Sequence, residues 1–220
     1  MKYLVLLFSL LFILPAEAKL TKEQKKELRK TTKWLSSFDL RYAKPWTPPG
    51  DSKSINMDCS NTARYLYKKA LNIDLPSGGS YDMYKYYKSH RQSAKSPKKG
   101  NEINVEKLSS KLKSGDLLFW INTHSDIDPS HTPPISHVMI YLGRSRKTGE
   151  MKMVGANTFG KGDFTEGGGP DVYTFDPNEF IGCVRTDRKN RKSPCIKGKE
   201  SKFFAFARPV IQSESEAADP

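Results

Sequence analysis

The spacing of apolar residues changes along the chain, and this change limits the possible folds more than any other feature of the sequence. Up to about residue 90, apolar side chains recur at intervals of three and four, as on one face of a helix. From Gly115 onward, the apolar runs become short and rich in β-branched and aromatic residues. Helical segments followed by strands predict an α+β fold with an antiparallel sheet.

The expected elements follow from this pattern and from the residues that interrupt it. Helices are predicted over Lys19–Phe38 and from about Ser60 to Leu71, and residues 80–88 are helical or irregular. The apolar face of the first helix holds Leu20, Leu28, Trp34 and Leu35. Predicted loops cover residues 41–57, 93–101, 122–135 and 160–170. Predicted strands cover residues 116–121, 137–142, 150–157 and 203–210.

Residues 1–18 have the layout of a secretory signal peptide. Lys2 precedes an unbroken apolar run at 3–14, and small residues follow at 15–18. The run is shorter than a membrane-spanning helix of about 20 residues, and no later segment is apolar enough to cross a bilayer. We therefore expect a secreted or periplasmic protein that begins at Lys19 and has no stable membrane anchor. A retained N-terminal anchor is the alternative.

The charge balance predicts an anionic partner. The chain holds 37 Lys and Arg against 24 Asp and Glu, a formal net charge of +13, with basic clusters at Lys95–Lys99 and Arg185–Lys202. No nucleic-acid recognition motif accompanies them, and export argues against a nucleic-acid partner. The Gly-rich residues 160–169 lack the pattern of a phosphate-binding loop. Residues 213–220 are small and acidic, and we expect them to be disordered.

The three cysteines fall into two contexts. Cys183 and Cys195 flank a basic, polar stretch, and thiols of exported proteins tend to pair, so a disulfide between them is predicted. Cys59 is then unpaired. It opens the second helix directly after Asp58, one of two candidate caps of that helix, the other being Ser60.

Cys59 has the setting of a thiol nucleophile. Backbone N–H groups at a helix start stabilise a thiolate, so we expect a lowered thiol pKa. A nucleophilic thiol also needs a base within hydrogen-bond reach. His137 stands at the first position of a predicted strand, at a sheet edge that the start of a helix can approach. Spacing alone does not distinguish this pair from a small buried cysteine and a surface histidine.

Four short motifs follow one another in order along the chain. They are Asp58-Cys59-Ser60 at a helix start, Leu75-Pro76 after that helix, Gly115-Asp116-Leu117-Leu118-Phe119, and Ser136-His137-Val138-Met139-Ile140-Tyr141-Leu142-Gly143. In order and spacing, the chain resembles the NlpC/P60 cysteine peptidases of bacterial cell walls. The resemblance covers about residues 42–160, and the predicted last strand is in keeping with it.

This resemblance implies a papain-like α+β fold, in which the helix that bears the cysteine packs on an antiparallel sheet. It implies a catalytic domain at residues 41–212, preceded by an N-terminal helical segment at 19–40. Cys59 would attack an amide carbonyl and form a thioester, with His137 as general base and no cofactor or metal. The implied activity is a cysteine peptidase that cuts peptidoglycan stem peptides, most often between D-Glu and the diamino acid. Muropeptides, anionic wall polymers or lipopolysaccharide are the partners to expect.

The residue that orients the base departs from the family pattern. Gly155 stands where the family usually has a polar residue. Asn157 follows two positions later, on the same face of the strand, and is the expected third catalytic residue. The loop after Ile121 is the other source.

The expected substrate contacts also depart from the pattern. Trp46 stands in place of a tyrosine upstream of the cysteine, and Asn61 in place of a glycine after it. We expect Trp46 to contact substrate, together with Asp58, Ser60 and Ser136.

Three alternatives stay open. The same Cys-His pair serves amidases and acyltransferases, and the fold also suits a catalytically inactive wall-binding protein. A zinc site is the third, since His and carboxylate side chains crowd one stretch, at His124, Asp126, Asp128, His131 and His137. Its prolines and the lack of a helical H-E-x-x-H pattern argue against zinc.

Overall fold

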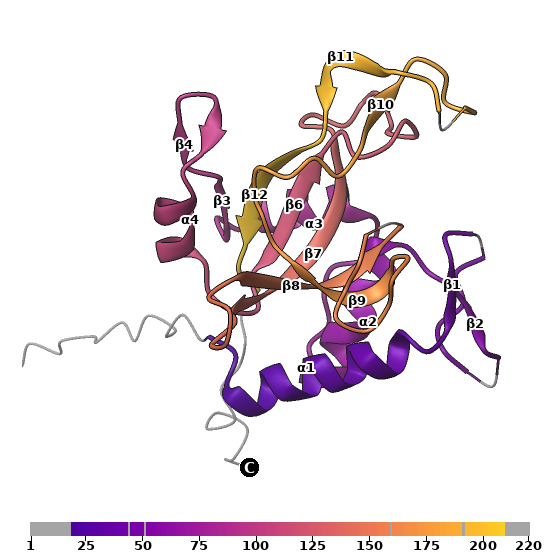
Figure 1. Cartoon of the computed structure of the whole chain (residues 1–220), viewed down its shortest axis with the longest axis vertical. Helices are drawn as coiled ribbons and strands as arrows, with labels where there is room; N and C mark the ends of the chain where they lie inside the picture. Colours follow the sequence, from indigo (N-terminus) through magenta and orange to yellow (C-terminus); the bar gives the residue numbers. More distant parts are fainter. Residues whose placement is uncertain (1–18, 44, 51, 159, 191, 210–220) are drawn as a thin grey trace, which may run out of the picture.

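The computed structural model describes residues 19–43, 45–50, 52–158, 160–190 and 192–209. In these residues, helices pack against one antiparallel sheet, with shorter strand pairs at its periphery (Figure 1). This is the α+β arrangement expected from the sequence. The predicted signal peptide and the acidic tail at 213–220 lie outside the described residues.

The central sheet has six strands, and every neighbouring pair is antiparallel. In spatial order they are β3 (Ser93–Lys95), β12 (Lys202–Ala207), β6 (Leu117–Ile121), β7 (Ile135–Arg144), β8 (Met151–Asn157) and β9 (Gly169–Thr174). The outer pairs are β1 (Asp39–Arg41) with β2 (Ser54–Asn56), β4 (Lys98–Lys99) with β5 (Glu102–Ile103), and β10 (Cys183–Arg185) with β11 (Cys195–Glu200). Because β6, β7, β8 and β9 are neighbours in sequence and in space, short connections build this half of the sheet.

Three of the four helices lie close to where the sequence pattern places them, and the fourth, α4, was not predicted. They are α1 (Lys22–Leu35), α2 (Cys59–Leu71), α3 (Ser80–Ser89) and α4 (Val105–Lys111). Asp58 is the N-cap of α2, as one of the two sequence alternatives stated, and it accepts a hydrogen bond from the Asn61 N–H. Thr21 caps α1 in a reciprocal arrangement with Gln24, so this helix starts three residues later than expected.

Apolar side chains cover both faces of the sheet. On one face, Leu28 of α1, Leu66 of α2 and Met83 of α3 belong to one buried cluster with the β7 residues Val138 and Ile140. The opposite face carries an aromatic cluster in which Trp120, Phe175 and Phe203 meet edge to face, with α4 packed beside it through Leu108. The strands that carry the candidate site are thus held from both sides.

Trp34 does not lie in this core. Its side chain is 45% exposed, although the sequence pattern places it with Leu28 and Leu35. Trp34 packs at the surface against Phe38 and Tyr65 instead, because the buried face of α1 is formed by Leu28, Thr31, Thr32 and Leu35.

Several short strands lie in segments predicted as loops. Strand β9 begins at the end of the Gly-rich stretch. Gly169 and Pro170 are not typical strand residues, so its pairing with β8 was not predicted. Strand β3 lies in the basic segment 93–101 and pairs with the edge of β12. Strand β2 lies within the Pro-rich segment 41–57 and pairs with β1, which ends at the first residue of that segment. These strands form through pairing with a neighbouring strand, and they have no clear apolar pattern of their own.

A buried ion pair joins the start of β6 to the end of β12. The Arg208 guanidinium donates to both carboxylate oxygens of Asp116, at 2.8 and 3.0 Å. The Asp116 side chain is 1% exposed, and it also accepts from the Lys113 N–H. Asp116 belongs to the third sequence motif, and its contacts give it a structural role in fixing the turn before β6.

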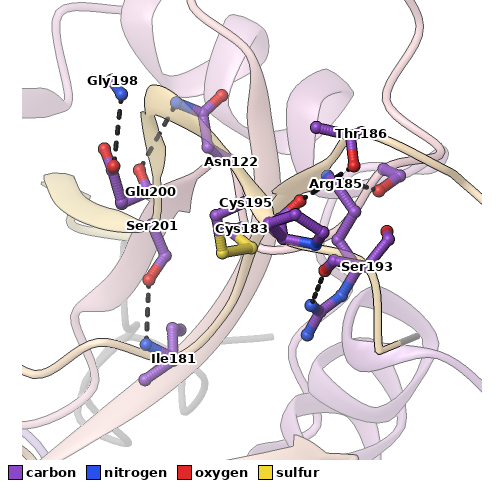
Figure 2. The surroundings of a disulfide bond; sticks show 12 residues. Asn122, Ile181, Cys183, Arg185, Thr186, Ser193, Cys195, Gly198, Glu200 and Ser201 are labelled. Carbon is purple, nitrogen blue, oxygen red and sulfur yellow. Dashed lines mark hydrogen bonds between the residues drawn. A yellow bond between two sulfur atoms is a disulfide. The ribbon is translucent and has the colours of Figure 1, made fainter. Parts of the chain in front are cut away.

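The disulfide between Cys183 and Cys195 is present, as predicted, and it joins β10 to β11 (Figure 2). Within the described part of the chain, no helix combines the length and apolar character needed to cross a membrane.

Candidate active site

A cavity of about 680 Å³ lies where the start of α2, the start of β7, the end of β8 and the loop of residues 122–134 come together. Six of the seven residues that the sequence proposed for the site line this cavity: Asp58, Cys59, Ser60, Ser136, His137 and Asn157. The seventh, Trp46, is not among the lining residues and is 38% exposed. The fold therefore gathers in one cleft residues that are almost a hundred positions apart in the sequence.

Cys59 sits at the first position of α2 and is the free cysteine of the chain. The carboxylate of Asp58, directly before it, accepts hydrogen bonds from the Asn61 N–H at 2.6 Å and the Ser60 hydroxyl at 2.7 Å. These bonds satisfy donors that the helix start leaves unpaired. They also hold a negative charge beside the thiol.

His137 lines the same cavity as the thiol because β7 packs against α2. The backbone N–H of Val138, the neighbour of His137, donates to the Cys59 sulfur. The His137 side chain is 8% exposed and its ring packs edge-on against Trp120, with centroids 5.8 Å apart. The candidate nucleophile and the candidate base therefore line one cavity, and the residue that follows the base contacts the thiol.

The protonation of this pair differs from the sequence prediction. Burial raises the pKa of the Cys59 thiol to about 12, and the Asp58 carboxylate adds to the rise. The backbone N–H groups of Val138, Ser60 and Cys59 oppose this shift but do not outweigh burial. The prediction of a lowered thiol pKa was therefore wrong, since a sequence pattern shows the helix start but not the desolvation around it.

Burial acts on the imidazole in the opposite sense. It lowers the pKa of His137 to about 4, the positive form of His124 lowers it further, and the charge of Asp58 opposes both. At neutral pH the resting site therefore holds a thiol beside a neutral imidazole rather than an ion pair. A neutral imidazole is the form that can accept a proton.

Replacing Asp58 by asparagine is expected to lower the pKa of the Cys59 thiol. Asparagine keeps the oxygen that caps α2 but removes the negative charge that disfavours the thiolate. The rate of Cys59 alkylation by iodoacetamide, measured at a fixed alkaline pH, should rise. Asp82→Asn is the matched control, because Asp82 caps α3 and lines the same cavity but does not shift the Cys59 pKa. Equal rates in the two variants would contradict the assignment.

Two residues are candidates for the side chain that orients His137. Asn157, at the end of β8, lines the cavity, but its side-chain oxygen accepts from the Thr158 N–H. His124, in the loop after Ile121, hydrogen-bonds the backbone of Ser136 and interacts electrostatically with His137. The described contacts therefore connect His124, rather than Asn157, with the base. The polar residue usual in the family has no space at Gly155, where a Cβ would lie 2.6 Å from the Met139 sulfur.

Tyr42 is a lining residue that the sequence analysis missed. Its hydroxyl donates to the Ala156 carbonyl oxygen at 2.8 Å, which joins the chain before α2 to the end of β8. Desolvation of its hydroxyl raises the pKa of Tyr42 well above its usual value, and the Cys59 thiolate, which forms only at high pH, and the Asp58 carboxylate add to the rise. The sequence provides little indication of this role, because Tyr42 stands at the start of a predicted loop and belongs to no helix or strand pattern.

Ser60 and Ser136 are bound within the cavity wall. Ser60 is 1% exposed and donates to Asp58, and the Ser136 hydroxyl accepts from the Thr123 N–H at 2.9 Å. The first serine fixes the helix cap and the second anchors the loop of residues 122–134. These contacts give both serines a positioning role at the site.

The histidines and carboxylates of that loop interact in separate pairs, His124 with Asp126 and His131 with Asp128. His131 stacks on Tyr81 of α3 with ring centroids 3.8 Å apart, and Asp128 accepts from the Ser130 N–H and hydroxyl. Among the residues that the structure describes, no three His, Cys, Asp or Glu side chains converge in a way that could hold a metal ion.

One comparison with known proteins covers this site. The family model described as the NlpC/P60 family matches residues 43–162, more than half of the chain. The matched segment contains Cys59, His124, His137 and Asn157, whereas β9 to β12 lie beyond it. The chain finds no match among curated proteins.

Proposed function

Because this chain belongs to the NlpC/P60 family of cell-wall hydrolases, we propose that it is an exported cysteine peptidase that cuts amide bonds in peptidoglycan stem peptides. The observation that carries the proposal is the contact between the Cys59 sulfur and the Val138 N–H. It brings the free thiol to the residue next to His137, in a cavity large enough for a peptide. In this proposal Cys59 is the nucleophile and His137 the general base.

The reaction begins from the neutral pair. As the Cys59 sulfur attacks the amide carbonyl carbon, its proton passes to the imidazole of His137, which a pKa of about 4 leaves free to accept it at neutral pH. The developing oxyanion lies at the start of α2, where the backbone N–H of Cys59 is the proposed donor. Collapse of this intermediate breaks the C–N bond, and His137 returns the proton to the leaving amine.

The thioester is then hydrolysed. Water gives one proton to His137 and attacks the thioester carbon, which releases the new carboxylic acid and restores the thiol. His124 is the proposed positioning residue for the base. It hydrogen-bonds the Ser136 backbone, and its positive form lowers the pKa of His137. Asn157, at the end of β8, is the alternative.

The proposed substrate bond is the one between D-Glu and the following diamino acid. A net charge of +13 suits a substrate rich in carboxylates.

Residues 1–18, with the layout of a signal peptide, support export. We therefore propose a secreted or periplasmic location.

Digestion of defined muropeptides tests the choice of bond. The protein from Lys19 onward is incubated with purified stem peptides and with muropeptides that retain the sugar, and the products are identified by mass spectrometry. We expect a new free amine on the diamino acid. Cleavage between the lactyl group and the peptide would favour an amidase, and transfer to an added amine would favour an acyltransferase. Tight binding without any product would favour an inactive wall-binding protein.

A further inference from the structure

The β10–β11 hairpin forms a wall of the cleft beyond the segment that matches the family. Cys183 and Arg185 of β10 line the cavity, as does Arg188 in the turn that follows. The disulfide closes the hairpin where Arg185 pairs with Cys195 (Figure 2). The basic cluster Arg185–Lys202, which the sequence analysis did not connect with the cleft, thus contributes two cations to the candidate active site.

This hairpin is fixed to the loop that carries His124. The backbone N–H of Arg185 donates to the Ser125 hydroxyl at 2.9 Å. At Gly182 a Cβ would lie 2.2 Å from the carbonyl oxygen of Thr123, and φ is +144°, so only glycine allows the two segments to pack this closely. The base of the hairpin is also tied to the start of β12, because Ile181 donates to Ser201 (Figure 2).

The guanidinium of Arg185 keeps its charge available for a ligand. It donates to the Ser193 carbonyl oxygen at 2.6 Å, which is a neutral partner and uses one of five N–H donors (Figure 2). Among the described residues, neither Arg185 nor Arg188 forms a salt bridge. A half-buried arginine with no carboxylate partner suits the binding of a carboxylate from outside the chain.

The acidic residues of the cavity come from other elements. Asp58 and Asp82 cap α2 and α3, and Asp126 and Asp128 belong to the loop of residues 122–134. Asp58, Asp82 and Asp128 accept backbone N–H bonds within their own segments. A bound carboxylate is therefore repelled by these elements and attracted to the hairpin, so the charges of the cavity orient the ligand.

We propose that Arg185 and Arg188 form a carboxylate-binding subsite, through which the enzyme selects stem peptides with a free carboxyl group beside the bond that is cut. The Cys183–Cys195 disulfide holds this subsite at the cleft. The inference rests on the proposed peptidase function, because it assigns the specificity of the same site.

Two pairs of stem peptides test the subsite. In one pair the D-Glu α-carboxyl is free or amidated, and in the other the side carboxyl of the diamino acid is free or amidated. We expect kcat/KM for the free carboxylate to exceed that for the amide by about tenfold in one pair, which corresponds to about 1.4 kcal/mol. Arg185→Gln and Arg188→Gln should each reduce this preference by raising KM for the carboxylate more than KM for the amide.

Lys199→Gln is the matched control, since Lys199 is an exposed cation on β11 that does not line the cavity. It should retain the preference. Equal turnover of both members of both pairs by the wild type overturns the subsite. The subsite is also overturned if Lys199→Gln loses as much of the carboxylate preference as Arg185→Gln does, because the preference then follows from net charge alone.

Binding separates this subsite from the peptidase proposal. With Cys59→Ala, calorimetry measures the Kd of each peptide without turnover, and the carboxylate should bind about tenfold more tightly than the amide. If the wild type cuts neither peptide, the peptidase proposal fails, and the Kd ratio still decides the subsite: a ratio near one overturns it.

The double variant Cys183→Ser, Cys195→Ser, checked by circular dichroism, should lose part of the carboxylate preference. Full preference in that folded variant overturns the role of the disulfide.

Discussion

His137→Ala is expected to lower kcat/KM for stem-peptide hydrolysis by about 10³- to 10⁴-fold. The variant keeps the Cys59 thiol but removes the base that accepts its proton, and a thiol with a pKa of about 12 gives almost no thiolate near neutrality on its own. The measurement is steady-state kinetics on a defined muropeptide across pH. Because the pKa of His137 is about 4, wild-type activity should persist down to weakly acidic pH and fall as the imidazole becomes protonated.

His90→Ala is the control for this variant, since His90 is an exposed residue at the end of α3 that does not line the cavity. It should keep wild-type kinetics. If His137→Ala cleaves the muropeptide at a rate within a few-fold of the wild type, His137 is not the base. An acidic limb of the pH profile centred near pH 6.5 instead of near 4 would contradict the buried, neutral state of the imidazole.

Arg208→Met is expected to lower the free energy of unfolding by about 3 kcal/mol. Methionine fills much of the same volume but leaves the carboxylate of Asp116 buried without its charged partner. Urea unfolding followed by circular dichroism measures the change. The double variant Asp116→Asn, Arg208→Met should recover part of the loss, because it also removes the buried charge.

Arg29→Met provides the matched comparison. Arg29 pairs with Asp163 at 2.8 Å, but its side chain is 43% exposed, so the loss should stay below about 1 kcal/mol. Similar losses in Arg29→Met and Arg208→Met would mean that burial of the Asp116 pair adds nothing to stability.

The sequence predicts those parts of the fold that depend on local pattern. The apolar stripe over Ser60–Leu71 and the cap at Asp58 define α2, and alternation over residues 137–142 defines the core of β7. Strands β9 and β3 were missed because their pairing with β8 and β12 is a tertiary contact that the residue patterns of the two strands do not show. Trp34 was misplaced because an amphipathic pattern does not show how wide the buried face of a helix is.

The candidate site shows the same division between local and tertiary information. Motif order pointed to Cys59 and His137, which line one cavity, and cysteine spacing in a chain expected to be exported predicted the disulfide. The pKa values could not be predicted, because the burial of the thiol and imidazole depends on packing between α2 and β7. Tyr42 and Arg185 reach the cavity through the tertiary fold, and no motif marks either residue.

The most direct test of the central claim compares the wild type with Cys59→Ala on purified peptidoglycan. Both proteins start at Lys19, and the released products are identified by mass spectrometry. The wild type should release fragments with one new free amine at a stem-peptide bond, and Cys59→Ala, with an unchanged circular dichroism spectrum, should release none. Equal product from both proteins would show that Cys59 is not the nucleophile. No product from a folded wild type would contradict the peptidase itself.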